Sequence, residues 1–246
     1  MSVSYRQDFR VSSRDLDFTG CVRPSAILGY LQETASAAAG ELHVSGAETR
    51  AKYHCFWMIV RMWVRMDEPL LWNDSFTIHT WHRGAKGASS YRDFNIIKDG
   101  KVIGEAVSAW VLADCDNFSL MRLDKLEEFQ TTDGGELCKD IKLHRVKLPA
   151  ELPGEELRPM RYSDTDTNSH VNNAKYADFA CDTLHMEELL QGKFIREFQL
   201  SYTGQCMAGE TITLKTAIDG DSCWAKGIGP DGKDRFESVF HLAPRP

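Results

Sequence analysis

The chain has 246 residues, of which 42% are hydrophobic and 26% are charged, so it can bury a full core as one large domain or two small ones. Its formal charge of −7 argues against nucleic acid as a partner, because phosphate groups call for a basic surface. The N-terminus lacks the apolar core of a secretory signal, and no apolar run is long enough to cross a bilayer. Seven irregularly spaced cysteines are typical of reduced thiols, and no zinc-binding spacing is present. We therefore expect a cytoplasmic protein that does not insert into a membrane and holds no metal or other cofactor.

The first half of the chain predicts a strand, a long helix and four further strands. Apolar residues recur at helical spacing from Ile27 to Leu42, and Pro24 fits the first turn of that helix. Alternating patterns then predict strands at 58–66, 76–80, 91–97 and 102–112. The tryptophans and methionines of these strands are expected to be core residues, although some could line a tunnel for an apolar chain. They are Trp57, Met58, Met62, Trp63, Met66 and Trp110.

The second half predicts the same order of elements. A helical pattern runs from Ala177 to Leu184, preceded by Asn172 or Asn173 as its cap. Strand patterns follow at 194–202, 211–216, 223–228 and 235–242. Between the halves, residues 116–155 form a charged connector with a short helix expected near 122–129.

The two halves also match directly. When Asp17 is aligned with Asp166, residues 16–24 lie over 165–173, and the turn signal at 99–101 matches the one at 231–233. A strand, a helix and an antiparallel sheet given twice predict an α+β fold, a tandem (double) hotdog with two long helices each wrapped by an antiparallel sheet. The predicted domains are residues 1–115, the connector 116–155 and residues 156–246.

The segment 161–176 concentrates polar side chains just before the second helix. Asp164, Asp166, Asn168 and His170 fall at every second position, so in an extended strand their side chains would leave one face. Such a set could polarise a carbonyl and activate a water molecule. Asp and Asn also gather at strand–helix junctions because they cap helices and form turns, so this segment alone leaves a structural role open.

Several stretches of the chain resemble the acyl-acyl carrier protein (acyl-ACP) thioesterases of plants and bacteria. Residues 166–176 (Asp-Thr-Asn-Ser-His-Val-Asn-Asn-Ala-Lys-Tyr) are similar to the active-site motif of that family. Residues 31–35 (Leu-Gln-Glu-Thr-Ala) resemble its first-helix signature, and 108–113 with 121–123 resemble the strand and connector that close its first repeat. The resemblance spans nearly the whole chain.

This resemblance implies hydrolysis of the thioester between a fatty acyl chain and the phosphopantetheine of acyl carrier protein, which ends fatty acid synthesis. It implies catalytic roles for Asp166, Asn168 and His170, with Cys206 near them. A homodimer stays open, and the comparison of the two repeats, not the resemblance, assigns catalysis to the second repeat and acyl-chain binding to the first. One position departs from the family pattern, because Gln205 stands where glutamate is typical. A glutamine can position water but cannot take its proton at neutral pH.

The residue chemistry assigns a role to each group. Asp166 is expected to act as the base or orienting carboxylate, Asn168 to hold the carbonyl or the water, and His170 to complete the proton path. Backbone N–H groups of residues 171–174, at the positive end of the helix, would face the oxyanion. The first repeat retains Asp17 but has Thr19 and Cys21 at the places of Asn168 and His170, which predicts a single active site.

Other readings of the same residues stay open. An acyl-CoA thioesterase of the same fold would differ only in what carries the pantetheine, a hotdog hydratase or dehydratase would act on the α,β-carbons, and a silent acyl-binding module would lack turnover. Asp164 is expected to be structural, Cys206 to support the site rather than attack the substrate, and His185 to face solvent. The candidates for docking an acidic carrier protein are basic residues near the motif, namely Arg158, Arg161, Lys193 and Arg196.

Overall fold

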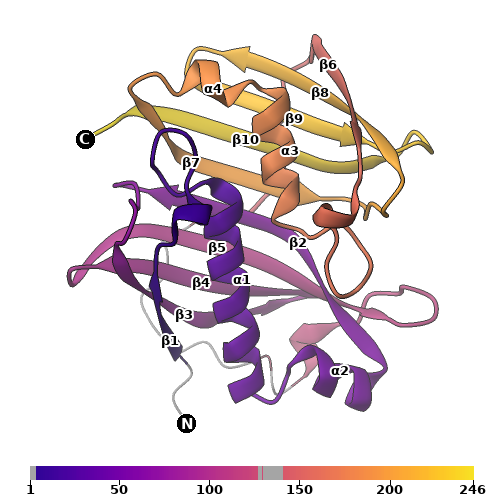
Figure 1. Ribbon diagram of the computed structural model, residues 1–246. Coiled ribbons are helices and arrows are strands. Elements are labelled where there is room, and N and C mark those ends of the chain that lie inside the picture. The colour runs from indigo at the N-terminus through magenta and orange to yellow at the C-terminus, as the bar shows by residue number, and fades with distance from the viewer. Residues whose placement is uncertain (1–3, 127–128, 130–140) are drawn as a thin grey trace. The chain divides into compact units, whose positions relative to one another are not determined.

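The computed structural model describes residues 4–126, 129 and 141–246 of the chain (Figure 1). The chain divides into two compact units. The first consists of Met1–Val11, Gly29–Val64 and Asn73–Leu143, and the second of Ser12–Leu28, Arg65–Trp72 and His144–Pro246. The domain boundaries at 115 and 156 concern the two sequence repeats and stay a prediction.

The first repeat contains the expected strand, long helix and four strands, together with one helix that the sequence analysis missed. The elements are β1 (Ser4–Arg10), η1 (a short 3-10 helix, Ser13–Asp15), α1 (Pro24–Glu41), α2 (Gly46–Tyr53), β2 (Cys55–Met66), β3 (Ser75–Lys86), β4 (Ser89–Lys98) and β5 (Lys101–Asp114). Pro24 begins α1 as predicted. The missed helix α2 has a capping box, in which the Ser45 hydroxyl accepts from Glu48 N–H and the Glu48 carboxylate accepts from Ser45 N–H.

The sheet of the first repeat runs in the order β1-β3-β4-β5-β2. Strands β1 and β3 are antiparallel, with Ser4 opposite Trp81 and Arg10 opposite Ser75. Helix α1 lies over this sheet in Figure 1, and Tyr30 on the helix contacts Phe9 of β1 and Phe76 of β3, with ring centroids 4.9 and 5.1 Å away. These aromatic contacts fix the helix on the sheet.

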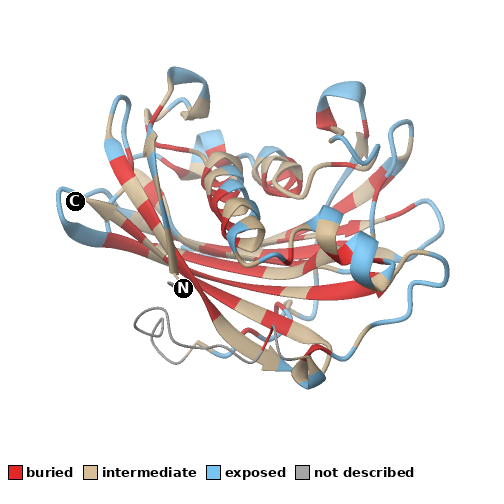
Figure 2. Cartoon of the chain, turned by 90° about the horizontal axis from the view of Figure 1, so that it is seen from below, coloured by how far each residue is buried: buried red, intermediate tan, exposed pale blue. Residues whose placement is uncertain are grey.

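The residues expected to form the core do so in large part. Met62, Trp63 and Met66 are buried, and Trp57 is partly buried with its indole N–H donating to Val44 O at 2.8 Å. Figure 2 shows buried positions along the strands and on the helices, with exposed positions at many turns. In the part of the chain that the structure describes, no helix is both long and apolar enough to span a bilayer.

The second repeat contains the same strand pattern with a shorter helix. Its elements are β6 (Gly154–Pro159), η4 (a 3-10 helix, Tyr162–Asp164), α3 (Lys175–Thr183), α4 (Met186–Leu189), β7 (Lys193–Tyr202), β8 (Thr211–Asp219), β9 (Ser222–Ile228) and β10 (Asp234–Pro244). The helical segment breaks at His185, whose φ of 52° is left-handed and cannot continue an α-helix. The His185 side chain is exposed, as predicted.

The sheet of the second repeat has the same strand order when it is read from β6, namely β6-β8-β9-β10-β7. Strands β6 and β8 pair antiparallel, with Pro159 opposite Thr211, as Arg10 lies opposite Ser75 in the first repeat. Helix α3 contacts this sheet through the buried side chains of Tyr176 and Phe179. The predicted α+β fold, with two hotdog repeats, is confirmed.

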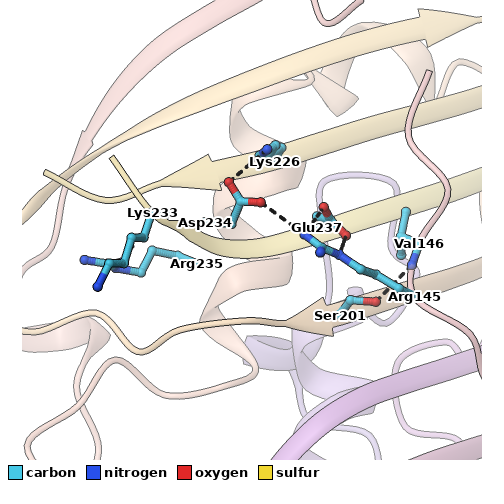
Figure 3. Close-up of polar contacts among 8 residues, drawn as sticks. All are labelled: Arg145, Val146, Ser201, Lys226, Lys233, Asp234, Arg235 and Glu237. Carbon is cyan, nitrogen blue, oxygen red and sulfur yellow. Dashed lines mark hydrogen bonds and ion pairs between the residues drawn. The ribbon is translucent and has the colours of Figure 1, made fainter. Parts of the chain in front are cut away.

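Of the connector expected at 116–155, residues 127–128 and 130–140 lie outside the described part, and strand β6 already begins at Gly154. The helix expected near 122–129 is present as a single 3-10 turn, η2 (Leu123–Lys125). At the other end, Arg145 binds Glu237 of β10 through two hydrogen bonds of 2.6 and 2.7 Å and Asp234 through one of 3.0 Å (Figure 3). Val146 N–H also donates to the Ser201 hydroxyl of β7, so the end of the connector is fixed across two strands.

Candidate active site

The motif that contains Asp166 forms a tight turn and not an extended strand. Asp166 N–H donates to His170 O at 2.9 Å, and Ser169 N–H donates back to Asp166 O at 3.1 Å. Ser169 has a left-handed φ of 63°, which reverses the chain between the two residues. The expectation of an extended segment from 164 to 170 is therefore wrong, because these backbone hydrogen bonds close a turn in which alternation no longer sets the direction of side chains.

Asp164 is separated from the other polar residues by this geometry. Its side chain is buried, and it accepts hydrogen bonds from Arg161 N–H at 2.7 Å and from the Arg158 guanidinium at 3.3 Å. Arg158 also lies over the Phe179 ring, 4.6 Å from its centroid. Asp164 thus closes the 3-10 turn η4, which agrees with the structural role expected for it.

The remaining three motif residues are together in the turn and accessible. One carboxylate oxygen of Asp166 accepts from Asn168 N–H at 2.8 Å, which holds the carboxylate over the turn. Asn168 is exposed, whereas Asp166 and His170 are partly exposed. Within the described residues, the amide of Asn168 and the imidazole of His170 bind no other side chain, so both can contact a substrate.

The loop that follows β7 brings Cys206 to this turn. Val171 N–H donates to Cys206 O at 2.9 Å, and His170 forms a bridge with Met207. Cys206 is buried, and its own N–H donates to the Tyr176 hydroxyl of α3 at 3.0 Å. Gln205, next to it, is exposed. The structure therefore places Asp166, Asn168, His170 and Cys206 in one hydrogen-bonded neighbourhood, with Gln205 at its solvent edge.

Two residues of this neighbourhood were missed by the sequence analysis, namely Tyr176 as a partner of Cys206, and Arg235. Arg235 of β10 is 8% exposed, and its carbonyl accepts from the N–H groups of Thr203 and Gly204 at 2.9 and 3.0 Å. A Cβ on Gly204 would meet Asp234 O at 3.0 Å and the Arg235 side chain at 3.3 Å, so the glycine permits this close approach. No local motif marks Arg235, because it comes from a strand far along the chain.

The environment of Cys206 keeps its thiol neutral. Burial raises the pKa of the Cys206 thiol, and the Tyr176 hydroxyl and the Arg235 guanidinium oppose this only in part. Burial likewise raises the pKa of the Tyr176 hydroxyl. A thiol with a raised pKa is a poor nucleophile at neutral pH, which agrees with a supporting role for Cys206.

The N-terminal end of α3 offers fewer free N–H groups than expected. Among residues 171–174, Val171 donates to Cys206 O, Asn172 to Asp164 O at 2.8 Å and Ala174 to the Asn172 side chain at 2.9 Å. Asn172 thus closes the turn before the helix, whereas Ala174 occupies the N-cap position. Of the four described amides, the Asn173 N–H is the one left to face an oxyanion.

The first repeat builds the same turn with different side chains. Asp17 N–H donates to Cys21 O at 2.8 Å, Gly20 N–H donates to Asp17 O at 3.0 Å, and Thr19 N–H donates to the Asp17 carboxylate at 2.8 Å. Gly20 has φ of 79°, matching the left-handed Ser169. The two turns therefore share a backbone conformation.

The adjacent loops match as well. Val22 N–H donates to Leu70 O at 2.8 Å, and Cys21 forms a bridge with Leu71. Leu70 thus stands where the second repeat has Cys206. The backbone does not need an amide at position 168 or an imidazole at 170 in order to form this turn, which argues against a purely structural reason for them.

Residues 2–128 match the N-terminal domain of the acyl-ACP thioesterases, and residues 151–231 match the C-terminal domain of the same family. The chain belongs to the acyl-ACP thioesterase family. The resemblance seen in the sequence is thereby confirmed over most of the chain.

The chain is similar to one curated acyl-ACP thioesterase in sequence and to two solved ones in fold. The oleoyl-acyl carrier protein thioesterase of Coriandrum sativum is 26% identical over 251 residues, which cover 94% of this chain and 67% of that protein. An acyl-ACP thioesterase from Bacteroides thetaiotaomicron superposes with a TM-score of 0.88 at 22% identity, covering 98% of both chains. The 12:0-ACP thioesterase from Umbellularia californica superposes with a TM-score of 0.85 at 18% identity, covering 100% of this chain and 99% of that one. These structural likenesses show the fold.

Proposed function

We propose that this chain hydrolyses fatty acyl-ACP thioesters at the Asp166 turn, releasing free fatty acid and so ending fatty acid synthesis. Thioester hydrolysis is the activity of the family to which the chain belongs. One observation supports the location of the site. The Asp17 turn and the Asp166 turn share a backbone conformation, but of the two only the Asp166 turn carries an amide and an imidazole, from Asn168 and His170, that could take part in hydrolysis.

Hydrolysis requires a water molecule to attack the thioester carbonyl. In the proposed mechanism the Asp166 carboxylate removes a proton from that water while the water oxygen forms a bond to the carbonyl carbon. The Asn168 amide holds the carbonyl or the water, and the Asn173 N–H, at the positive end of α3, faces the oxyanion. The tetrahedral intermediate then breaks its C–S bond. The pantetheine thiolate leaves and receives, through His170, the proton that Asp166 took from the water, so that Asp166 is a carboxylate again and the carboxylic acid is the second product.

Gln205 and Cys206 are assigned supporting roles in this mechanism. Gln205 has no carboxylate, so it can orient water by hydrogen bonding but not act as a second base. Cys206 links the site to α3 and to the 203–207 loop through its backbone bonds to Tyr176 and Val171. Asp166 is therefore the base that the mechanism requires.

The division of labour between the repeats stays part of the proposal. Residues 156–246 contain the reacting groups, and residues 1–115 are proposed to bind the acyl chain. Of the basic residues considered for docking the carrier, Lys193 is paired with Asp221 and Arg196 with Asp67, whereas Arg161 is exposed. A cytoplasmic location and a homodimer also remain predictions.

The proposal is tested by measuring free-acid release from acyl-ACP substrates of several chain lengths, with matched acyl-CoA substrates and an enoyl-ACP in parallel. Asn168→Ala and His170→Ala should each lower turnover strongly while the melting temperature stays near that of the wild type, because neither side chain bonds elsewhere in the described chain. The exposed neighbour Thr167→Ala serves as a control that should retain activity. Preference for CoA would overturn the assigned carrier. Hydration of the enoyl substrate without acid release would overturn hydrolysis.

A further inference from the structure

The guanidinium of Arg235 lies against two glycines beside the candidate active site. A Cβ on Gly229, which follows β9, would overlap Arg235 Cζ and Nη2. A Cβ on Gly204, in the loop after β7, would lie 3.3 Å from Arg235 Cδ. Because protein interiors leave no room for overlapping atoms, a residue other than glycine at position 229 would displace the guanidinium. The two glycines therefore leave a space that the arginine side chain fills.

An ion pair and two backbone hydrogen bonds hold Arg235 in this place. Arg235 Nη2 lies 2.8 Å from the Asp231 carboxylate, and the Arg235 side chain is 9% exposed. The Arg235 carbonyl accepts from the N–H groups of Thr203 and Gly204 at 2.9 and 3.0 Å. The guanidinium also lies near Cys206, since its positive charge lowers the pKa of that thiol against the effect of burial. Arg235 thus contacts the 203–207 loop through its backbone and through its charged group.

The first repeat shows that the fold does not need an arginine at this position. When the turn signals of the two repeats are aligned, Ile103 stands at the place of Arg235, and Ile97 stands at that of Gly229. Ile103 is 3% exposed, so an apolar side chain fills the equivalent position. Burying a guanidinium costs more than burying an isoleucine, and Arg235 Nε is buried with no hydrogen-bond partner in the described chain. An arginine that is unfavourable for folding, placed beside the reacting groups, indicates a role in the reaction.

We propose that Arg235 is a positioning residue for thioester hydrolysis, whose guanidinium keeps the 203–207 loop in the place where the loop bonds to the Asp166 turn. Val171 N–H, at the end of that turn, donates to Cys206 O in the loop, so a shift of the loop would also move the turn. The inference rests on the proposed function, because it concerns the same reaction. It assigns Arg235 no contact with the substrate.

The test measures free-acid release from acyl-ACP by the full chain, both as the single-turnover rate at saturating substrate and as KM. Arg235→Met should lower the rate about tenfold to a hundredfold and leave KM within about threefold of the wild type, since small displacements of reacting groups cost rates on that order. Gly229→Ala keeps every charge but displaces the guanidinium, and it should lower the rate to a similar extent. The double variant should be no slower than the slower single variant, because both changes act on the same guanidinium.

Arg145→Met is the matched control. Arg145 also pairs with carboxylates of β10, and Figure 3 shows it at a separate place along that strand from Arg235. Arg145→Met should lower the melting temperature while the single-turnover rate stays that of the wild type. If Arg235→Met gives this same result, with a lower melting temperature and an unchanged rate, its role is structural and the proposal is wrong.

Asp231→Asn decides if Arg235→Met does not fold. Asp231 is exposed, and an asparagine can still accept the hydrogen bond from Lys233 N–H, so the variant mainly removes the ion pair with Arg235. Its single-turnover rate should fall about threefold, the effect of one partly exposed ion pair, and an unchanged rate would overturn the proposal. Absence of acid release by the wild type would instead count against the proposed function, whereas an active wild type with fully active variants would count against the role of Arg235 alone.

Discussion

The two matching turns provide an internal control for catalysis. Asp166→Asn and Asp17→Asn make the same chemical change in the same backbone conformation. Each carboxylate accepts a 2.8 Å hydrogen bond from the N–H two residues further on, and an asparagine oxygen can still accept it. Asp166→Asn should therefore lose about 0.5–1.5 kcal/mol of stability for the one weakened hydrogen bond, and Asp17→Asn should lose more, because Asp17 also accepts from the Thr19 hydroxyl and from Cys21 N–H.

The effect on turnover should be different at the two positions. A carboxamide cannot remove a proton from water, and general base catalysis is worth about 10²–10⁴-fold. Asp166→Asn should therefore raise the barrier by about 2.7–5.4 kcal/mol, whereas Asp17→Asn should stay within about threefold of the wild type.

The assay is free-acid release under single-turnover conditions, with melting temperatures measured on the same samples. Equal loss of activity in the two variants would refute the argument, because it would mean that the turn matters as structure. Full activity of Asp166→Asn would also refute it, since another group would then have to be the base.

Three further predictions concern the surroundings of the turn. Cys206→Ser should retain turnover within about tenfold of the wild type. In the wild type, burial raises the pKa of the Cys206 thiol, so less of it is thiolate at pH 7 than in a free cysteine. Alkylation of Cys206 by iodoacetamide should therefore be slow at pH 7 and accelerate as the pH rises. Gln205→Ala should lower the single-turnover rate about tenfold or less, the worth of one neutral hydrogen bond, and a loss as large as that of Asp166→Asn would contradict a positioning role. Arg145→Met should lower the free energy of unfolding, measured in urea, by about 1–3 kcal/mol. This loss is smaller than for breaking a fully buried ion pair, because the Arg145 side chain is 51% exposed. Adding Glu237→Gln to Arg145→Met should restore part of the lost stability, because no unpaired carboxylate is then left.

Most of the architecture could be predicted from the sequence, because its periodic patterns coincide with the elements that form. The periodicity of apolar residues reflects which side chains are buried, and it can be read from the sequence. This holds for the alternation of methionine and tryptophan in β2 and for the helical spacing from Ile27 to Leu42. Pro24 marked the start of α1. Helix α2 was missed although the pair Ser45 and Glu48 signals its capping box, because its apolar pattern is weak.

The geometry of the site was less accessible from the sequence. Whether the segment from 164 to 170 is extended or turned depends on backbone hydrogen bonds and on the left-handed Ser169, and strand-like alternation cannot distinguish the two. The break at His185 has the same cause, since a positive φ at a histidine has no reliable signal. Tyr176 and Arg235 reach Cys206 from separate elements, so that only the folded chain brings them together.

Main-chain hydrogen bonds join each turn to its neighbouring loop, as with Val22 and Leu70 or Val171 and Cys206. Such bonds are indifferent to which side chains the residues carry. The turn can therefore form in a repeat whether or not that repeat carries reactive side chains. The first repeat illustrates this, because Thr19 and Cys21 take the places of the amide and the imidazole while the backbone bonds of the turn are kept.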